Sequence, residues 1–395
     1  MNKNIAILSS TYLPVQGGIQ YLLLWLLKEL DNNYYEYKQK YNFDNIYFII
    51  PNYENSTFDK FKNIKVLYID ESMNKQTLLK NTFIIRKYIK DYNISLLHAH
   101  NALFDGILCY LSTLYTKCNY IITSHGVDFA YSKELDYGFR LSKFREKIIK
   151  IVSSNAIKIT SVSNDMLNFI AEISDKKKTI LIENCYDCNK VIYSEENVTK
   201  EENKIKSKFK IESNDIIYLT LSGARKIKGH ENMIKAFSKI KDKLSNTKIF
   251  IAAHGEESIY LKKLVQELKL DNNIYFIGFV TDIKKEAFFN ISDVYINTAF
   301  FEPFGLVYLE AIESNLSVFG SIQGGGKDIF IHKTNAYLCD PYNIKTMEDG
   351  FIFYNDKTNI EKMMNNSKKL LSKYAVENIL SKYLTLYDNS INEQN

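Results

Sequence analysis

Residues 297–320 read NTAFFEPFGLVYLEAIESNLSVFG. The short apolar run that leads into it, residues 293–297, predicts a buried strand. The run Leu306–Glu313 has the periodicity and the length of a helix, and Pro303 and Gly305 before it favour a turn. The sequence therefore predicts a strand, a tight loop and the start of a helix in direct succession.

The loop before this helix is a candidate anion site. The first amides of a helix have no partners within the helix and carry the positive end of its dipole. We expect such amides at Phe304, Gly305 and Leu306, where Gly305 lets a ligand approach the backbone. Two carboxylates, Glu302 and Glu310, flank this loop.

The spacing of the two carboxylates limits their chemistry. A fully helical segment from Glu302 to Glu310 would place their Cα atoms roughly 12 Å apart. Two carboxylates that act on one glycosidic bond lie about 5 to 9.5 Å apart. The spacing therefore favours residues that hold the two ends of an extended ligand. The alternative is that Glu302 caps the helix and Glu310 is solvated.

The stretch resembles the Glu-x7-Glu element of the family 4 retaining glycosyltransferases. The resemblance implies an α/β protein of the GT-B fold, in which two Rossmann-like domains have parallel sheets that face each other across a cleft. It also implies that Glu302 and the amides of Phe304, Gly305 and Leu306 contact the donor sugar. Glu310 would then hold the ribose hydroxyls.

Composition is consistent with a two-domain globular protein. The chain has 395 residues, 46% of them hydrophobic and 25% charged. Its net charge of +5 lies in residues 1–190, which contain 24 basic and 19 acidic residues. This excess is too small to indicate nucleic acid binding, and it is compatible with an anionic membrane surface or a phosphorylated acceptor.

Cysteine usage and hydropathy indicate a cytoplasmic protein. Five cysteines without even spacing argue against a disulfide framework, and the one C-x-x-C, Cys185 to Cys188, has no partner pair or histidine at zinc spacing. No apolar run approaches the about 20 residues of a membrane-spanning helix. We expect neither a metal nor a cofactor.

Alternating strands and helices predict two parallel sheets. The expected strands lie at 5–9, 46–50, 66–69, 96–99, 120–124 and 158–162, and then at 216–221, 248–253, 274–279 and 294–297. We expect an acceptor-binding domain at 1–190, a domain for the nucleotide-sugar at 191–373, and a helix at 374–395 that crosses back to the first domain. The polar run 193–208 is interpreted as the connection.

Glycines and histidines mark the strand ends of the first domain. Gly17-Gly18 precedes a predicted helix, but not as G-x-G-x-x-G, so a dehydrogenase is disfavoured. The family has such a pair where donor phosphate or acceptor approaches, and a tight turn is the alternative. By the same resemblance His125 contacts the donor sugar and His100 faces the acceptor, whereas His98 packs under the sheet.

A cationic loop follows the first strand of the second domain. Residues 222–229, SGARKIKG, resemble the family's Gly-Arg and Lys-Gly pattern with a shorter loop. Arg225 and Lys228 would neutralise the charge that grows on a leaving diphosphate. The resemblance also places the nucleotide base near Phe279 and Val280.

Residues 131–152 mix basic and aromatic side chains at helical spacing. This mixture is typical of an interfacial helix that touches anionic lipid, and an ordinary solvated helix is the alternative.

The resemblance therefore implies a retaining, metal-independent glycosyltransferase, which we expect to act in bacterial surface polysaccharide or glycoconjugate assembly. Its expected partners are a nucleotide-sugar, with UDP the commonest base of the family, and a glycan or lipid-linked acceptor. A nucleotide-sugar epimerase of the same fold and an inactive glycan-binding subunit remain alternatives.

Overall fold

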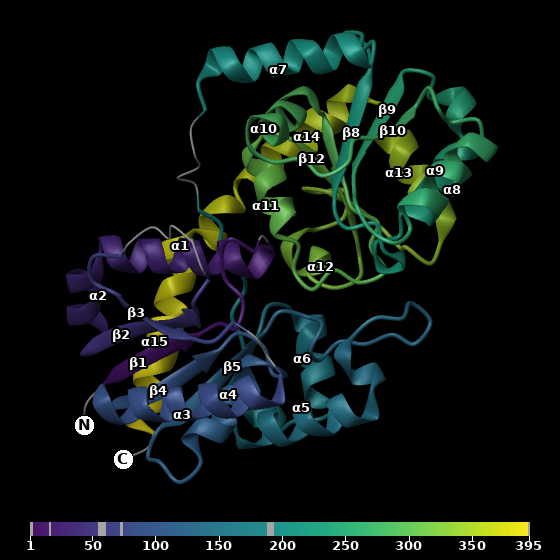
Figure 1. The fold of residues 1–395 in the computed structure, drawn as a ribbon. Coiled ribbons are helices and arrows are strands. Elements are labelled where there is room, and N and C mark those ends of the chain that lie inside the picture. The colour runs from purple at the N-terminus through teal and green to yellow at the C-terminus, as the bar shows by residue number, and fades with distance from the viewer. Residues whose placement is uncertain (1–2, 16, 54–60, 72–73, 188–192, 394–395) are drawn as a thin grey trace. The chain divides into compact units, whose positions relative to one another are not determined.

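The computed structural model describes residues 3–15, 17–53, 61–71, 74–187 and 193–393. The chain divides into two compact units. Unit 1 comprises Met1–Asp187 and Tyr374–Asn395, and unit 2 comprises Cys188–Lys373. Each unit contains one parallel sheet packed with helices (Figure 1), so the prediction of two Rossmann-like domains is confirmed.

The sheet of unit 1 has the strand order β3-β2-β1-β4-β5-β6-β7. The strands are β1 (Asn4–Leu8), β2 (Asn45–Pro51), β3 (Lys65–Ile69), β4 (Ile94–Ala99), β5 (Asn119–Ser124), β6 (Lys158–Ser161) and β7 (Thr179–Leu181). All six predicted strands are present, and β7 is an additional one. Their continuous apolar runs are buried because helices cover a parallel sheet on both faces.

The helices of unit 1 form two layers (Figure 1). They are α1 (Gly18–Asn32), α2 (Tyr34–Tyr41), α3 (Lys75–Asp91), α4 (Asp105–Thr113), α5 (Lys143–Asn155), α6 (Asn164–Ala171) and α15 (Val376–Asn392). Helices α1, α2 and α15 share one hydrophobic core with strands β1 and β2. Helices α3, α4 and α5 pack side by side as a separate row. The C-terminal helix α15 thus belongs to unit 1.

The prediction of one helix across residues 131–152 is wrong. A bridge joins Ser132 to Tyr137, and α5 begins only at Lys143, where the Ser142 hydroxyl caps its first turn. The helix is interrupted because Gly138 has a φ of 101°. Arg140 is buried and pairs with two glutamates, so it is not part of an exposed basic face.

The sheet of unit 2 has the strand order β10-β9-β8-β11-β12-β13. The strands are β8 (Ile216–Leu221), β9 (Thr247–Ala252), β10 (Ile274–Phe276), β11 (Val294–Ile296), β12 (Ser317–Ser321) and β13 (Tyr337–Cys339). The four predicted strands are present, although β10 ends three residues earlier than expected. Strands β12 and β13 were not predicted.

The helices of unit 2 pack around this sheet (Figure 1). They are α7 (Glu195–Lys208), α8 (His230–Ser238), α9 (Ser258–Glu267), α10 (Asp282–Ile291), α11 (Leu306–Glu313), α12 (Gly326–Ile329), α13 (Ile344–Phe353) and α14 (Lys357–Lys368).

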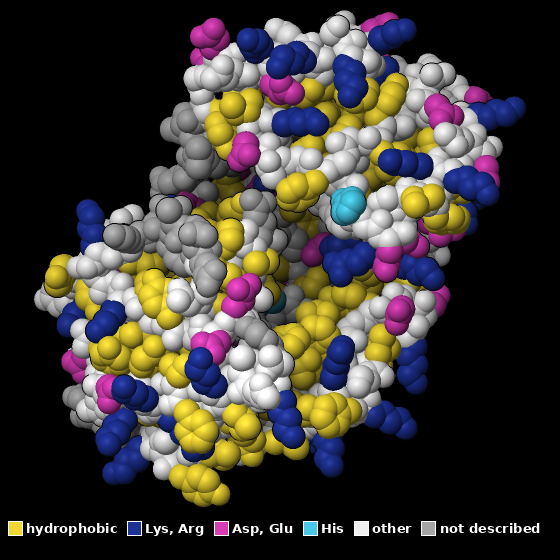
Figure 2. Space-filling model, viewed as in Figure 1, with side chains coloured by type: hydrophobic (Ala, Val, Ile, Leu, Met, Phe, Trp, Pro, Cys, Tyr) yellow, Lys and Arg dark blue, Asp and Glu magenta, His cyan; other side chains and the backbone are white. Residues whose placement is uncertain are grey.

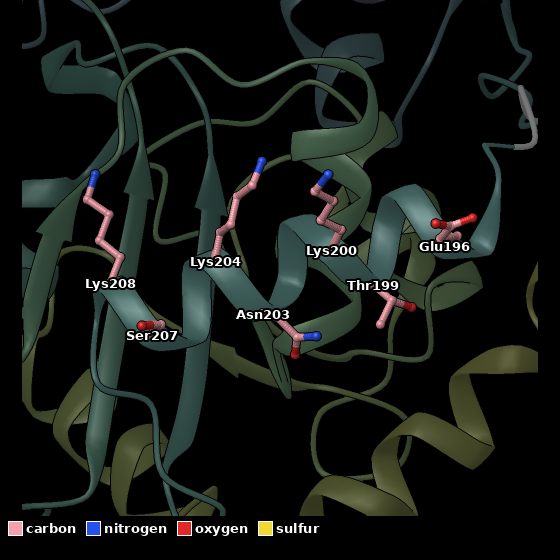
Figure 3. A pocket seen from close by; sticks show the side chains of 7 residues that line it. All are labelled: Glu196, Thr199, Lys200, Asn203, Lys204, Ser207 and Lys208. Carbon is pink, nitrogen blue, oxygen red and sulfur yellow. The ribbon is translucent and has the colours of Figure 1, made fainter.

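The predicted connection at 193–208 is instead mostly the helix α7. This helix packs on α10 and buries Val198 and Ile205. On its exposed side a surface hollow lies along a single helix face, where Lys200, Lys204 and Lys208 extend in the same direction (Figure 3). None of the predicted site residues lines this hollow.

Candidate functional site

The loop between β11 and α11 has the predicted form, with Gly305 immediately before the helix. Gly305 has a φ of 87°, in the left-handed region that favours glycine. A Cβ atom at this position would lie 2.4 Å from a ring carbon of the buried Tyr308. The glycine therefore lets α11 start close to its own loop and leaves the amide end of the helix uncovered by a side chain.

A glycine triplet after β12 holds the backbone of Glu302. The amide of Gly325 donates to the Glu302 carbonyl at 2.8 Å. Gly324 has a φ of 85°, and a Cβ atom there would lie 2.0 Å from the same carbonyl oxygen. Residues larger than glycine would therefore displace the loop that carries Glu302.

The Glu302 carboxylate contacts two side chains from neighbouring loops. Lys228 Nζ lies 2.8 Å from Glu302 Oε2, and the side-chain amide of Asn297 donates to the same oxygen at 3.2 Å. The side chains of Lys228 and Glu302 are each about 15% exposed. The second carboxylate oxygen, Oε1, has no hydrogen-bond partner within the described ranges, so it is available to a ligand.

Two backbone contacts bring Lys228 to Glu302. The Phe300 amide donates to the Ile227 carbonyl at 2.8 Å. Gly229 has a φ of 68°, and a Cβ atom there would lie 2.1 Å from the Thr298 carbonyl oxygen. The loop after β8 and the loop after β11 are therefore in close backbone contact, because β8 and β11 are adjacent strands of the parallel sheet.

Glu310 lies one turn further along α11 and has an ionic partner of its own. Lys285 Nζ, from α10, lies 2.8 Å from Glu310 Oε2. The Glu310 side chain is 17% exposed and that of Lys285 is 36% exposed. The contact is an ion pair without the geometry of a hydrogen bond, and it lies near the surface of unit 2.

The remaining predicted donor residues differ in exposure. Arg225 is exposed just before the turn Lys226–Lys228, and its guanidinium has no partner among the residues that the structure describes. The Phe304 side chain is buried, so only its backbone can meet a ligand. Phe279 is 73% exposed, whereas Val280 is buried, and both lie in the loop after β10.

Unit 1 gathers three histidines at the carboxyl ends of β4 and β5. His100 Nδ1 lies 3.1 Å from His125 Nε2, and the two rings stack. His98 is buried between the Tyr387 hydroxyl of α15 and the Thr123 hydroxyl, at 2.7 Å from each. The prediction that His98 packs within the fold is confirmed.

Burial keeps the three imidazoles neutral. Desolvation lowers the pKa of His98 to about 3 and that of His125 to about 4, and it holds the pKa of His100 well below its ordinary value. Asp105 is also buried and accepts from the amides of Ser10 and His100, yet desolvation raises its pKa to about 6. The partly exposed His125 is therefore a neutral hydrogen-bonding group rather than a cation.

Gly17 and Gly18 lie at the start of α1. Gly17 precedes the helix with a φ of −176°, an extended conformation that any residue adopts, and Gly18 is exposed. A Cβ atom at Gly17 would meet only the flexible end of Gln20, at 2.6 Å. The backbone thus does not require glycine at position 17.

Within the described ranges no cluster of His, Cys, Asp and Glu is arranged to hold a metal ion, and no helix is long and apolar enough to cross a membrane. Cys109, Cys118, Cys185 and Cys339 are buried free thiols. Cys188, the second cysteine of the C-x-x-C pattern, lies outside the described residues.

Comparison with known families covers both units. Residues 201–370 match the family described as "Glycosyl transferases group 1", and residues 44–190 match "Glycosyltransferase Family 4". The chain belongs to the family 4 glycosyltransferases. The family predicted from the stretch around Glu302 is therefore confirmed.

Relatives and solved structures agree with this family. N-acetyl-alpha-D-glucosaminyl L-malate synthase of Bacillus anthracis is 23% identical to this glycosyltransferase over 300 residues, which cover 75% of this chain and 74% of the relative. Sucrose-phosphate synthase from Thermosynechococcus elongatus matches with a TM-score of 0.76 at 16% identity over 98% of each chain. Anabaena HepE in complex with UDP-glucose matches with a TM-score of 0.73 at 17% identity over 97% and 99% of the two chains. These structures confirm the GT-B fold.

Sequence reasoning missed two residues of the unit 2 site in this glycosyltransferase. Asn297 was visible at the end of the predicted strand, where polar side chains often meet ligands. Lys285 gave no local signal, because only the packing of α10 beside α11 places it on Glu310.

Proposed function

We propose that this glycosyltransferase moves a hexose-type sugar from a nucleoside-diphosphate donor, with UDP as the carrier, to a glycan or lipid-linked acceptor. The configuration at the sugar is retained, and neither a metal nor a cofactor takes part. The observation that carries the proposal is the contact of Lys228 and Asn297 with Glu302, next to the amide end of α11.

In this proposal unit 2 binds the donor. Glu302 and the amides of Phe304, Gly305 and Leu306 hold the sugar. Lys228 and Arg225 hold the diphosphate. Lys228 is largely shielded from water, and Arg225 is exposed and has no partner among the described residues. Glu310 holds the ribose hydroxyls, and Phe279 and Val280 border the base.

The proposed chemistry places growing negative charge beside fixed cations. The bond from the sugar carbon to the phosphate oxygen breaks, the acceptor oxygen bonds to that carbon on the same face, and the departing phosphate takes the acceptor proton. Lys228, which Glu302 holds in place, lies beside the phosphate on which this charge develops. Preorganised cations of this kind stabilise a leaving group without a metal.

We assign the acceptor side to unit 1. The prediction that His100 itself faces the acceptor does not fit its buried side chain, so we assign it the role of holding His125. Gly17 and Gly18 let acceptor or donor phosphate approach the start of α1, and His125 contacts the transferred sugar. A neutral imidazole can donate one hydrogen bond and accept another, which suits a sugar hydroxyl. The low pKa of His125, which desolvation produces, supports this role.

The names of the relatives support a nucleotide-sugar donor. HepE was crystallised with UDP-glucose, and the Bacillus anthracis relative is named as an N-acetylglucosaminyl malate synthase. These properties belong to those proteins, and we extend only the class of donor to this chain. We further propose a role in surface polysaccharide or glycoconjugate assembly, in the cytoplasm and peripherally at the inner face of a membrane.

A donor screen followed by a transfer assay tests the proposal. Thermal shifts with a panel of nucleotide-sugars identify the donor, and mass spectrometry of reactions with candidate acceptors identifies the product. Wild-type protein is expected to form a glycosylated product, and Glu302→Gln to form none while it remains folded. Donor turnover that leaves an isomerised nucleotide-sugar without any acceptor, detected by NMR, would indicate an epimerase instead.

A further inference from the structure

Three segments of unit 1 form a continuous surface, which we call the α3–α5 face. It consists of the exposed sides of α3 and α5 and the turn at residues 114–117 that follows α4. Helix α4 packs against both α3 and α5 and so joins them into one row, and the turn continues directly from the end of α4. Their buried residues are absent from the core that α1 and α15 share, which places the α3–α5 face on the other side of the sheet.

This face exposes large hydrophobic side chains. Tyr115 is fully exposed, Phe144 is 74% exposed and Phe83 is 66% exposed, with Leu79 and Ile151 exposed beside them. Leu79 and Phe83 are four residues apart on α3, and Phe144 and Ile151 are seven apart on α5, so each pair lies on one side of its helix. Single exposed hydrophobic residues are ordinary, but a group on adjoining segments marks an interaction site.

The same face is strongly basic. Helix α3 contains five Lys or Arg residues and one acidic residue, and α5 contains four and one. The acid of α5, Glu146, is already bound by the buried Arg140. In Figure 2 hydrophobic side chains alternate with Lys and Arg along the part of unit 1 that contains these helices. The exposed cations are Lys75, Lys80, Lys87 and Lys90 on α3, Lys117, and Lys143, Arg145, Lys147 and Lys150 on α5.

We propose that the α3–α5 face docks onto the surface of an anionic lipid bilayer. Aromatic rings enter the headgroup region, and the aliphatic stems of lysines follow them while the ammonium groups reach lipid phosphates. A second copy of this chain is a poor occupant, because symmetric contact would bring cations against cations. The proposal deepens the peripheral membrane location given above, and it replaces the segment 131–152 with a surface to which α3 contributes equally.

Vesicle flotation tests this proposal, with phosphatidylcholine vesicles and with vesicles that also contain phosphatidylglycerol. Wild-type protein is expected to float only with the anionic vesicles. The triple variant Lys87→Gln, Lys143→Gln, Lys147→Gln is expected to bind about a hundredfold more weakly, because each basic residue near such a surface contributes about a factor of five. The variant Phe83→Ser, Tyr115→Ser, Phe144→Ser is expected to bind the anionic vesicles at least tenfold more weakly than wild type.

Matched variants of unit 2 serve as controls. Lys200→Gln, Lys204→Gln, Lys208→Gln removes the same charge from the exposed side of α7, and Ile259→Ser, Tyr260→Ser, Ile331→Ser removes exposed hydrophobic residues elsewhere. Both are expected to bind vesicles as wild type does. The proposal would be overturned if the α7 variant lost as much vesicle binding as the α3–α5 lysine variant. It would also be overturned if wild type bound neutral vesicles as well as anionic ones.

Two further readouts separate this proposal from others. Turnover of the donor in solution is expected to be the same in the α3–α5 variants as in wild type. A loss of vesicle binding is therefore distinguishable from a loss of the proposed enzyme activity. Loss of a dimer in light scattering of the serine variant, without any vesicle binding by wild type, would assign the face to a second copy and overturn the membrane assignment.

Discussion

Replacing Lys228 by methionine tests how much one cation contributes to the reaction. Lys228 Nζ lies 2.8 Å from Glu302 Oε2, and both side chains are largely shielded from water. If the ammonium group lies against the diphosphate as charge develops, its loss removes one preorganised electrostatic contact. Such contacts contribute about 3–4 kcal/mol to the transition state, so kcat is expected to fall roughly 10²- to 10³-fold.

The same substitution leaves the Glu302 carboxylate with one hydrogen bond, from Asn297. Breaking a fully buried pair costs about 3–5 kcal/mol, and partial exposure reduces this to about 1–2 kcal/mol. The melting temperature is expected to fall by roughly 2–8 °C.

The assay for Lys228→Met measures release of nucleoside diphosphate at saturating donor and acceptor, together with the melting temperature. The control is Lys226→Met, which removes an exposed lysine from the same 3-10 turn. A kcat for Lys228→Met within threefold of wild type would refute the role given to this lysine.

Three other predictions concern individual contacts. Lys285→Met is expected to raise the donor KM about three- to tenfold with little change in kcat, because Glu310 loses the partner that positions it; Lys284→Met, an exposed neighbour, should leave both constants unchanged. Gly324→Ala is expected to lower the free energy of unfolding by more than about 2 kcal/mol, since the new Cβ meets the Glu302 carbonyl. The control is Gly278→Ala, because Gly278 also has a positive φ but nothing lies near a Cβ atom at that position. An equal loss of stability in both variants would show that backbone strain, and not the contact with the Glu302 carbonyl, is responsible. His98→Gln is expected to flatten the dependence of stability on pH. The pKa of His98 is about 3 in the folded state and about 6.5 in the unfolded state, so the unfolded state takes up a proton first as pH falls. This uptake lowers the free energy of unfolding of the wild type by about 2 kcal/mol between pH 7 and pH 5. Urea titrations at the two pH values measure this difference, and an unchanged pH dependence in His98→Gln would contradict it.

Local features of the fold were predictable from the sequence. The strand before Asn297, the turn at Gly305 and the helix Leu306–Glu313 each depend on neighbours in the chain, and they occur as predicted. The same holds for the six strands predicted in unit 1, whose apolar runs are long enough to recognise.

Features that depend on tertiary packing were not predictable. Lys228 and Glu302 are 74 residues apart and meet because β8 and β11 are neighbours in the sheet. The polar run at 193–208 concealed a helix, since only Val198 and Ile205 of α7 are buried. The segment 131–152 has helical spacing throughout, yet the positive φ of Gly138 and the buried Arg140 interrupt it.

A crystal structure of this glycosyltransferase with bound UDP tests the central claim most directly. The account predicts a diphosphate within hydrogen-bonding distance of Lys228 Nζ and the Arg225 guanidinium, with the ribose hydroxyls on Glu310. A nucleotide bound elsewhere in unit 2, with Glu302 and Glu310 both remote from it, would contradict the account.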